Sequence, residues 1–372
     1  MKVAVAGLGR MGTVHALHLH ELAAETGGCE LAALADIDVE RARRFNVELG
    51  CRAPIFSSIE ELAKADVCDA TVIVTPTEKH REHAAMMIAA GHRVLLEKPL
   101  TGTLNADREF AMELDRYYPN ALMLAFQRRF DPPLIHAKEL VESGAIGRVF
   151  KIYSALEDSN PAPNGYRSGG ILPDMSVHNV DEILWLTGRI PSSALAIGSR
   201  VYSHGLTTCI EDFDDALLYL WFETDLIAQV QVSRNHVSGY RVETVLYGEE
   251  GQIHIGRFEQ NPFEVAVEAY GRRGLTAPIA FRKFPMRKYR RPLPEFVDRF
   301  GAAYKAELAA FIDCCRTGIS FPTNHRDGVR AQEVISAGMR CMTGPEQAAR
   351  VESDKAPNAK PSQVKSDFDR SL

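Results

Sequence analysis

The sequence predicts an α/β fold for roughly the first third of the chain and an α+β domain for most of the rest. Three observations predict this. A short apolar strand runs through a glycine loop into a helix at the start of the chain. Strands and helices then alternate regularly to residue 125, which is typical of a parallel sheet. A long series of strands with alternating apolar and polar residues follows, which indicates a large, mostly antiparallel open sheet.

The composition is that of a globular protein with room for two domains. The chain has 372 residues, of which 45% are hydrophobic, and a formal net charge of -6. Because there is no block of Lys and Arg, we expect neither a nucleic-acid partner nor a membrane partner. The seven cysteines are odd in number and form no CxxC pair, so we expect reduced thiols rather than disulfides or a thiolate zinc site. Met1 leads directly into a strand-like run, and no apolar stretch is long enough to span a bilayer, so we expect a cytoplasmic protein.

The first strand, residues 3–6, runs into Gly7-Leu8-Gly9-Arg10-Met11-Gly12, and residues 13–25 suit a helix. This is the GxGxxG pattern in its proper strand–helix context. Its glycines permit a tight turn, a close approach of the backbone to a pyrophosphate and close helix packing, and the helix N-terminus attracts the phosphates. The segment therefore predicts an N-terminal Rossmann dinucleotide-binding domain.

A second strand, residues 31–35, ends in Asp36 at the spacing where an acidic side chain accepts hydrogen bonds from the adenosine ribose. Ile37 brings no charge and Asp38 adds a negative one, where the 2′-phosphate of NADP would lie. We therefore expect NAD as the cofactor. Three arginines on the next helix could reach a phosphate but suit a solvated helical face, so NADP stays a weaker alternative; they are Arg41, Arg43 and Arg44.

Two further strands end in residues that suit a ligand site. Residues 70–74 lead into Thr75-Pro76-Thr77, and a helix follows from His80 to residue 90. Residues 93–96 end in Glu97-Lys98-Pro99. The residue before a proline favours extended backbone, so the Lys98 ammonium should project from the carboxyl end of its strand, where open parallel sheets bind ligands. The alternative is an ordinary solvated loop. We expect no metal, because the nearby histidines have no acidic or thiolate partners at matching spacing.

The chain changes character after a strand at residues 121–125. We expect the NAD-binding domain to span residues 1–125, a substrate-binding and oligomerisation domain to span 126–344, and 345–372 to be a flexible polar tail. After one helix to about residue 143, strands are predicted over 148–157, 194–202, 216–223, 226–234, 242–247, 252–258 and 264–269. Too few helices remain to cover both faces of that sheet, which favours a homo-oligomer, either a dimer or a tetramer.

A second group of chemically active residues lies between the first two of those strands. Gly169-Gly170 precedes a helix-like segment with Asp174 and His178 four residues apart, which places both side chains on one helix face. The alternative is an amphipathic helix with solvated acids and a core histidine. With Lys98, these residue types suit a dehydrogenase: His178 as general base, Lys98 stabilising the alkoxide and Asp174 orienting the substrate.

Four motifs together resemble the Gfo/Idh/MocA oxidoreductases, which include inositol dehydrogenases. They are the glycine loop, Thr75-Pro76-Thr77 with His80, Glu97-Lys98-Pro99, and the segment from Gly169 to His178. The resemblance implies that Lys98 lies beside the nicotinamide, that the peptide before Pro99 is cis, and that Lys98, Asp174 and His178 are catalytic. Pro173 and Asn179 depart from the common pattern. The expected cofactor contacts are Gly7, Gly9, Arg10, Met11, Gly12, Asp36, Ile37, Thr75, Pro76, Thr77, His80, Glu97, Lys98 and Gln127.

The predicted function is oxidation of a ring hydroxyl of a cyclic polyol or pyranose by NAD, with an inositol as the first candidate. Two alternatives stay open, a sugar oxidoreductase that holds NAD tightly and oxidises transiently, and a catalytically silent sugar-sensing binder. Loop and strand-end residues supply candidate substrate contacts beside the catalytic three. They are Arg129, Glu157, Ser159, Tyr166 and His236.

Overall fold

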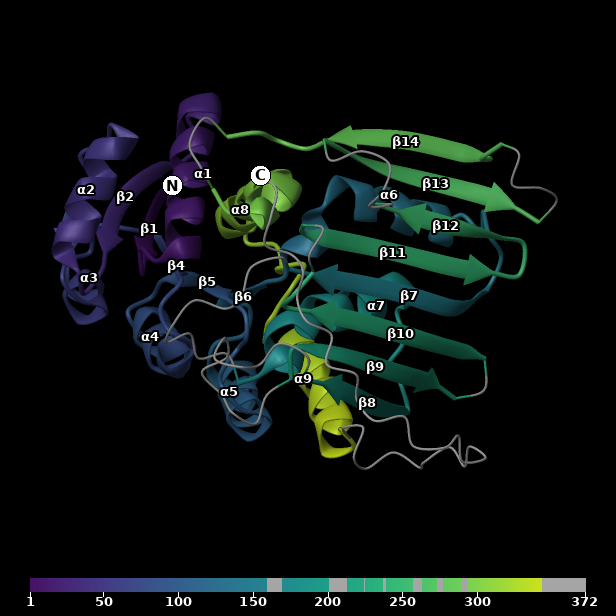
Figure 1. The fold of residues 1–372 in the computed structure, drawn as a ribbon. Coiled ribbons are helices and arrows are strands. Elements are labelled where there is room, and N and C mark those ends of the chain that lie inside the picture. The colour runs from purple at the N-terminus through teal and green to yellow at the C-terminus, as the bar shows by residue number, and fades with distance from the viewer. Residues whose placement is uncertain are drawn as a thin grey trace, which may run out of the picture.

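The computed structural model describes residues 1–158, 169–200, 213–223, 225–236, 239–256, 263–272, 277–289 and 293–342. Two sheets organise them (Figure 1). The first has six parallel strands and the second has eight strands that are mostly antiparallel. The predicted fold class, a Rossmann domain followed by an α+β domain with a large open sheet, is confirmed.

The N-terminal sheet has the strand order β3-β2-β1-β4-β5-β6. Its strands are β1 (Lys2–Ala6), β2 (Glu30–Ala35), β3 (Ile55–Phe56), β4 (Ala70–Ile73), β5 (Arg93–Glu97) and β6 (Leu122–Ala125). Its helices are α1 (Arg10–Thr26), α2 (Val39–Leu49), α3 (Ile59–Lys64), α4 (His80–Ala89) and α5 (Leu104–Tyr117), with a 3₁₀ turn, η1 (Thr77–Lys79), before α4. The strand order reverses between β1 and β4, and open α/β sheets bind ligands at the carboxyl ends of the strands at such a point.

The C-terminal sheet has the order β14-β13-β12-β11-β7-β10-β9-β8, and β7 pairs with β10 in parallel. Its strands are β7 (Val149–Glu157), β8 (Ser193–Ser199), β9 (Asp215–Phe222), β10 (Leu226–Ser233), β11 (Arg241–Gly248), β12 (Gly251–Ile255), β13 (Glu264–Gly271) and β14 (Ala280–Pro285). The sequence predicts all of these except β14. The predicted ends at residues 202 and 258 lie outside the described residues.

One face of the C-terminal sheet is covered by helices and the other is open among the described elements (Figure 1). The covering helices are α6 (Pro132–Glu142), α7 (Val177–Thr187) and α9 (His325–Arg340). Short helical turns precede two of them, η2 (Gln127–Phe130) and η3 (Leu172–Ser176). No described helix is long and apolar enough to cross a membrane.

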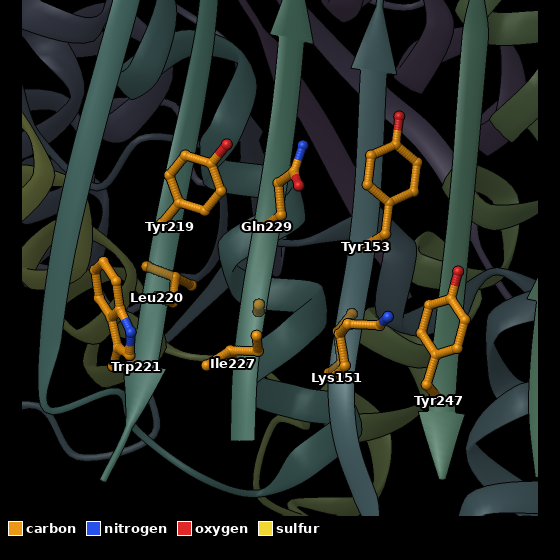
Figure 2. A pocket seen from close by; sticks show the side chains of 10 residues that line it. Lys151, Tyr153, Tyr219, Leu220, Trp221, Ile227, Gln229 and Tyr247 are labelled. Atoms are coloured by element: carbon orange, nitrogen blue, oxygen red, sulfur yellow. The ribbon is translucent and has the colours of Figure 1, made fainter. Parts of the chain in front are cut away.

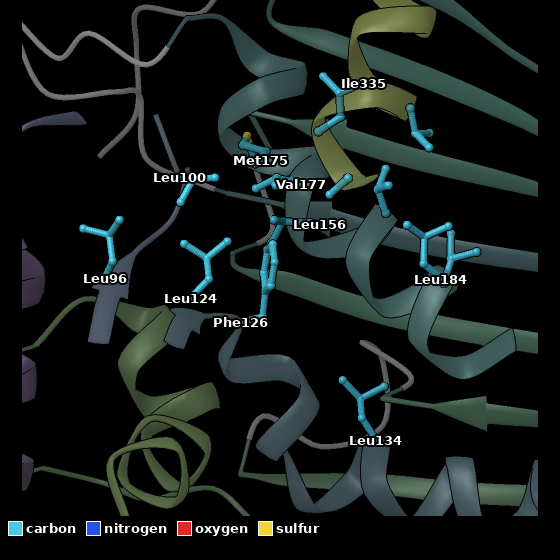
Figure 3. Close-up of a cluster of buried hydrophobic side chains, with 14 of the residues drawn as sticks. Leu96, Leu100, Leu124, Phe126, Leu134, Leu156, Met175, Val177, Leu184 and Ile335 are labelled. Atoms are coloured by element: carbon cyan, nitrogen blue, oxygen red, sulfur yellow. The ribbon is translucent and has the colours of Figure 1, made fainter. Parts of the chain in front are cut away.

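Helix α8 (Glu295–Thr317) returns the chain to the N-terminal sheet. Its apolar side chains, among them Leu308 and Phe311, join the core cluster of Val3, Val5 and Leu34. A larger cluster connects the two sheets through Leu96, Leu124 and Phe126 on one side and Leu156, Met175 and Val177 on the other (Figure 3). The turn after β5 and the segment before α7 are therefore held by one continuous core.

Glu307 on α8 is fully buried, and neither of its carboxyl oxygens has a hydrogen-bond partner among the described residues. Burial raises the pKa of Glu307 well above its ordinary value. Its folded pKa is above the unfolded one, so ionisation opposes folding increasingly as the pH rises. We expect Glu307→Met to stabilise the protein by about 1–3 kcal/mol at pH 8 and by less at pH 5. Thermal unfolding at both pH values measures the change in stability, and Asp313→Ala, at an exposed position of the same helix, is the control. A loss of stability of Glu307→Met at pH 8 would contradict the prediction.

Candidate active site

The glycine loop after β1 has the geometry that the sequence predicts. Gly7 has φ +90°, and a Cβ there would lie 2.6 Å from the Val74 carbonyl oxygen. A Cβ on Gly12 would lie 1.7 Å from the Gly7 carbonyl oxygen, so α1 packs directly on the loop. Gly9 precedes α1 and has open space beside it. The loop can therefore admit a pyrophosphate beside the first amides of α1.

Asp36 lies at the carboxyl end of β2 and is buried. Its Oδ2 accepts a hydrogen bond from the Leu8 amide at 2.6 Å, and its Oδ1 accepts one from the Asp38 amide at 2.8 Å. The carboxylate thus fixes the glycine loop and still has lone pairs for ribose hydroxyls. Arg41 Nη1 lies 3.7 Å from Asp36 Oδ2. Ile37 is 94% exposed, which leaves an apolar surface next to the ribose acid.

The residues after β4 and β5 meet at the same edge of the sheet. Thr75 and Thr77 are partly buried there and Pro76 is exposed. The Lys98–Pro99 peptide is cis, as the family resemblance implies. Glu97 turns inward: its Oε1 lies 2.7 Å from His15 Nε2, and its Oε2 accepts a hydrogen bond from the Lys98 amide at 3.1 Å. Glu97 therefore fixes the backbone from which the Lys98 side chain projects.

The Lys98 ammonium reaches across to the segment before α7. Its Nζ donates to the Asp174 carbonyl oxygen at 2.9 Å and lies 3.3 Å from Asp174 Oδ1. Arg234 Nη2 lies 3.5 Å from Asp174 Oδ2. The Asp174 carboxylate therefore lies between two cations, one from each sheet.

Asp174 and His178 lie on a continuous helical segment with an unusual first turn. Residues Leu172–Ser176 form a π-helical turn, which leads directly into α7. Single π turns within helices occur frequently at functional sites. The Asp174 amide donates to the Gly170 carbonyl oxygen at 3.1 Å, and Gly170 has φ 114°. The glycine pair thus supplies a backbone shape that other residues rarely adopt.

His178 is held in an environment that favours its neutral form. Burial, the Lys98 ammonium and the Arg128 guanidinium all lower the pKa of His178, which falls well below its ordinary value of 6.5. At neutral pH its imidazole is therefore available to accept a proton. Because the Lys98 ammonium contributes to this shift in pKa, the two side chains interact electrostatically.

Buried polar contacts hold α7 against the C-terminal sheet. The Arg128 guanidinium lies 2.6 Å from Glu182 Oε2, and both side chains are buried. Ser154 on β7 donates to Glu182 Oε1 at 3.3 Å, and Asn179 donates to Ser154 at 2.7 Å. Residues 179 and 182 flank His178 on the helix. The ion pair and its hydrogen bonds therefore limit rotation of α7 relative to the sheet.

Three other predicted substrate contacts are paired elsewhere. Arg129 forms ion pairs with Asp181 at 2.5 Å and Asp327 at 3.1 Å. Glu157 shares a face of the sheet with Gln231 and Arg241, which donate to it at 2.6 and 3.0 Å, and this is the face opposite α7. His236 Nε2 lies 3.5 Å from Glu157 Oε2. Among the described residues, the contacts of these three side chains given above are with groups other than Asp174. Ser159 and Tyr166 lie outside the described residues.

Arg234 contacts Asp174 but is not among the residues predicted from the sequence. Residues 228, 230 and 232 of β10 are buried on the face that meets η3, and strand alternation continues this face to Arg234. The alternation is visible in the sequence. Asp174 cannot be identified as the partner of Arg234 without the strand order. Gln127 is buried at the start of η2, next to the Arg128 ion pair. Among the described residues, no group of three or more His, Cys, Asp and Glu side chains could hold a metal ion.

The chain matches two family models. Residues 1–117 match the model described as an oxidoreductase family with an NAD-binding Rossmann fold, and residues 134–254 match the GFO/IDH/MocA C-terminal domain. The open space at Gly9, the carboxylate of Asp36 and the exposed Ile37 fit such a cofactor. NAD is therefore the cofactor of this fold, and Arg10 and Met11 lie at the start of the helix that would face its phosphates.

Similar proteins extend the match over nearly the whole chain. The scyllo-inositol 2-dehydrogenase (NAD(+)) of Bacillus subtilis (strain 168) is 30% identical over 86% of this chain and 87% of its own. The structure of a myo-inositol dehydrogenase from Corynebacterium glutamicum is 27% identical, with a TM-score of 0.76, over 92% of this chain and 96% of its own. The structure of scyllo-inositol dehydrogenase from Lactobacillus casei with bound NAD(H) and scyllo-inositol shares the fold, with a TM-score of 0.76 at 24% identity over 92% of this chain and 96% of its own. The chain therefore belongs to the Gfo/Idh/MocA family of NAD-linked oxidoreductases.

Proposed function

We propose that the protein oxidises a ring hydroxyl of a cyclic polyol, with myo- or scyllo-inositol as first candidates, or of a pyranose sugar, to the ketone or lactone. The observation that carries the proposal is the contact of the Lys98 ammonium with Asp174, on the helical segment that also carries His178. The pKa of His178 is lowered, which supports a neutral imidazole. NAD supplies the hydride acceptor. The similarity to inositol dehydrogenases supports the substrate class.

The protein's own residues would handle the proton. His178, neutral at working pH, accepts the hydroxyl proton as general base. The Lys98 ammonium stabilises the negative charge that develops on the substrate oxygen, because a charged donor strengthens most as that charge forms. Asp174 holds the Lys98 ammonium and offers a carboxylate oxygen to a neighbouring substrate hydroxyl. Arg234 fixes Asp174 from the second sheet.

The polarity of this site favours a polyhydroxylated ring. An ammonium, a carboxylate, an imidazole and a guanidinium surround the reacting position and leave little apolar surface for an aliphatic alcohol. Buried polar groups discriminate strongly against ligands that cannot pair with them. A ring with several hydroxyls can pair with all four groups, whereas a linear secondary alcohol cannot.

A substrate screen tests the proposal. We expect NADH to accumulate when NAD and the protein are mixed with at least one of myo-inositol, scyllo-inositol or a glucose-like pyranose. Linear secondary alcohols and 2-hydroxy acids should give none. Activity on hydroxy acids without activity on any cyclitol or sugar would contradict it. Net NADH also distinguishes this function from transient oxidation with tightly held NAD and from a silent sugar-sensing binder, neither of which accumulates NADH.

The proposed cofactor contacts include Asp36, and its substitution gives a prediction. We expect Asp36→Ala to weaken NAD binding about tenfold, or about 1.4 kcal/mol, and to reduce discrimination against NADP. The ribose acceptor and its negative charge are lost together. Because Asp36 also accepts from the Leu8 amide, Asp36→Asn, which keeps an acceptor oxygen, is the matched comparison. Equal dissociation constants for wild type and Asp36→Ala, measured with both cofactors, would contradict this placement.

We also propose that the open face of the C-terminal sheet pairs two copies of the chain. Aromatic and aliphatic side chains from neighbouring strands line a hollow there (Figure 2). Trp221 on β9 is 39% exposed and Ile227 on β10 is 50% exposed, and both point away from the helices. An exposed apolar patch of this kind is typical of an interface. The two strands pair, so Trp221 and Ile227 are direct neighbours.

Light scattering after size-exclusion chromatography tests this pairing. We expect the wild type to have at least twice the mass of one chain. Trp221→Glu with Ile227→Glu should lower the mass, because the carboxylates would have to be buried without partners. Ile319→Glu changes an exposed residue in the connection between α8 and α9 and should leave the mass unchanged. A monomeric wild type, or an unaffected double variant, would contradict the pairing.

A further inference from the structure

The short turn that carries Lys98 is fixed by side chains from three helices. From α1, His15 holds Glu97, whose other oxygen accepts from the Lys98 amide. From α5, Asp107 accepts from the Thr101 amide at 2.8 Å. From α4, His80 Nδ1 lies 2.7 Å from the Pro99 carbonyl oxygen. The backbone on both sides of Lys98 is therefore held by buried polar contacts.

His80 differs from the other two because its second ring nitrogen contacts the cofactor edge. Its Nε2 lies 2.9 Å from the Thr75 carbonyl oxygen, at the carboxyl end of β4. The side chain is 2% exposed. Both ring nitrogens thus lie within hydrogen-bond distance of protein carbonyl oxygens. One buried ring joins the segment Thr75-Pro76-Thr77 to the turn that presents Lys98.

The hydrogen bonds of these two contacts depend on the protonation state of the His80 ring. Carbonyl oxygens only accept hydrogen bonds, and a neutral imidazole has one N–H to donate. Burial lowers the pKa of His80, whereas the carbonyl oxygens of Pro99 and Thr75 and the nearby Glu97 carboxylate oppose that shift. A neutral His80 donates a hydrogen bond to one carbonyl oxygen, and an imidazolium donates to both. Small movements of either segment therefore change the hydrogen bond on the other side of the ring.

We propose that His80 is a positioning residue that couples the cofactor segment Thr75-Pro76-Thr77 to the placement of the Lys98 ammonium. The inference rests on the proposed catalytic role of Lys98. When bound NAD restricts the segment after β4, the His80 ring restricts the position of the Pro99 carbonyl and therefore of Lys98. An active-site displacement of about 1 Å can lower the rate on the order of 100-fold. Loss of a contact this close to Lys98 can therefore lower kcat measurably.

Kinetics of three variants test the coupling. We expect His80→Ala to lower kcat by about 10- to 100-fold while the dissociation constant of NAD changes by less than about threefold. His80→Gln keeps a side-chain N–H donor and should recover part of kcat. The matched control is His83→Ala on the same helix, whose ring contacts the Thr75 hydroxyl and not the Pro99 carbonyl. It should keep kcat within about twofold of the wild type.

Hydrogen exchange gives a readout that needs no substrate. In the wild type, NAD should slow amide exchange in residues 100–104 as well as in 77–79. In His80→Ala, NAD should still slow exchange in 77–79 but no longer in 100–104. Unchanged kcat, or equal protection of 100–104 in both proteins, would overturn the inference. A variant that fails to bind NAD or to fold would also overturn it, because His80 would then be structural. A wild type that makes no NADH would count against the proposed function, and the exchange result would still decide the coupling.

Discussion

Lys98→Met is expected to lower kcat by about 100- to 1,000-fold and to leave the affinity for NAD nearly unchanged. The ammonium interacts most strongly with the alkoxide that forms as the hydride leaves, so its loss acts mainly on the transition state. Methionine keeps much of the volume of the lysine stem but has no donor. The Asp174 carboxylate would keep Arg234 as its cation, at 3.5 Å, so the local fold should survive. Steady-state kinetics and direct titration with NAD measure the two quantities.

Lys283→Met is a suitable control because Lys283 lies on β14 and pairs with Glu264 at 3.0 Å, at the surface. It should have no measurable effect on kcat. If Lys98→Met turned over at the wild-type rate, Lys98 would be a structural ion-pair partner of Asp174, and the proposed mechanism would be wrong. A large loss of NAD affinity would instead assign the ammonium to cofactor binding.

His178→Asn is expected to lower kcat/KM by about 100- to 10,000-fold, the range for loss of a general base. It should also change the pH dependence. The pKa of His178 is lowered, so the wild type should lose activity only as the pH falls below the ordinary histidine value of 6.5. The protonated imidazole cannot accept the substrate proton, and this acid limb should disappear in His178→Asn.

The matched control is His136→Asn on α6, where the ring lies beside Glu139 and Phe284, neither of which belongs to the candidate site. Its kcat/KM profile should follow the wild type. An acid limb that persisted unchanged in His178→Asn would show that another group accepts the proton. Asp174→Asn could then be compared in the same assay, because the Asp174 carboxylate contacts the Lys98 ammonium and can also accept a proton.

The parts of the site that lie at strand ends could be predicted from the sequence. Asp36 and Lys98 each follow a buried strand, and the carboxyl ends of parallel strands meet at one edge, so their proximity follows from the fold class. Helical spacing predicts that Asp174 and His178 lie on one helix face. The structure places Asp174 in a π turn, which local sequence rules do not distinguish from an α turn.

The rest depends on contacts between distant segments. Glu157 lies at a strand end like Lys98, but strand alternation directs it to the face opposite α7, where Arg241 holds it. The partner of Arg234 is set by the order of β7 and β10. Helix α8 packs on α1 and shares a core cluster with β1, although both lie far earlier in the chain. Strand β14 is an edge strand with mostly exposed side chains, so it lacks an apolar alternation. The limits of the domains at residues 125 and 344 stay a prediction.

The most direct test of the central claim is transfer of deuterium from substrate to cofactor. The protein would be incubated with NAD and an inositol or pyranose deuterated at each ring carbon that bears a hydroxyl, and the NADH formed would be examined by mass spectrometry. We predict NADH that carries one deuterium, and a rate at least about 100-fold lower with Lys98→Met. NADH without deuterium, or no NADH from any cyclitol or pyranose, would contradict direct hydride transfer from a ring carbon.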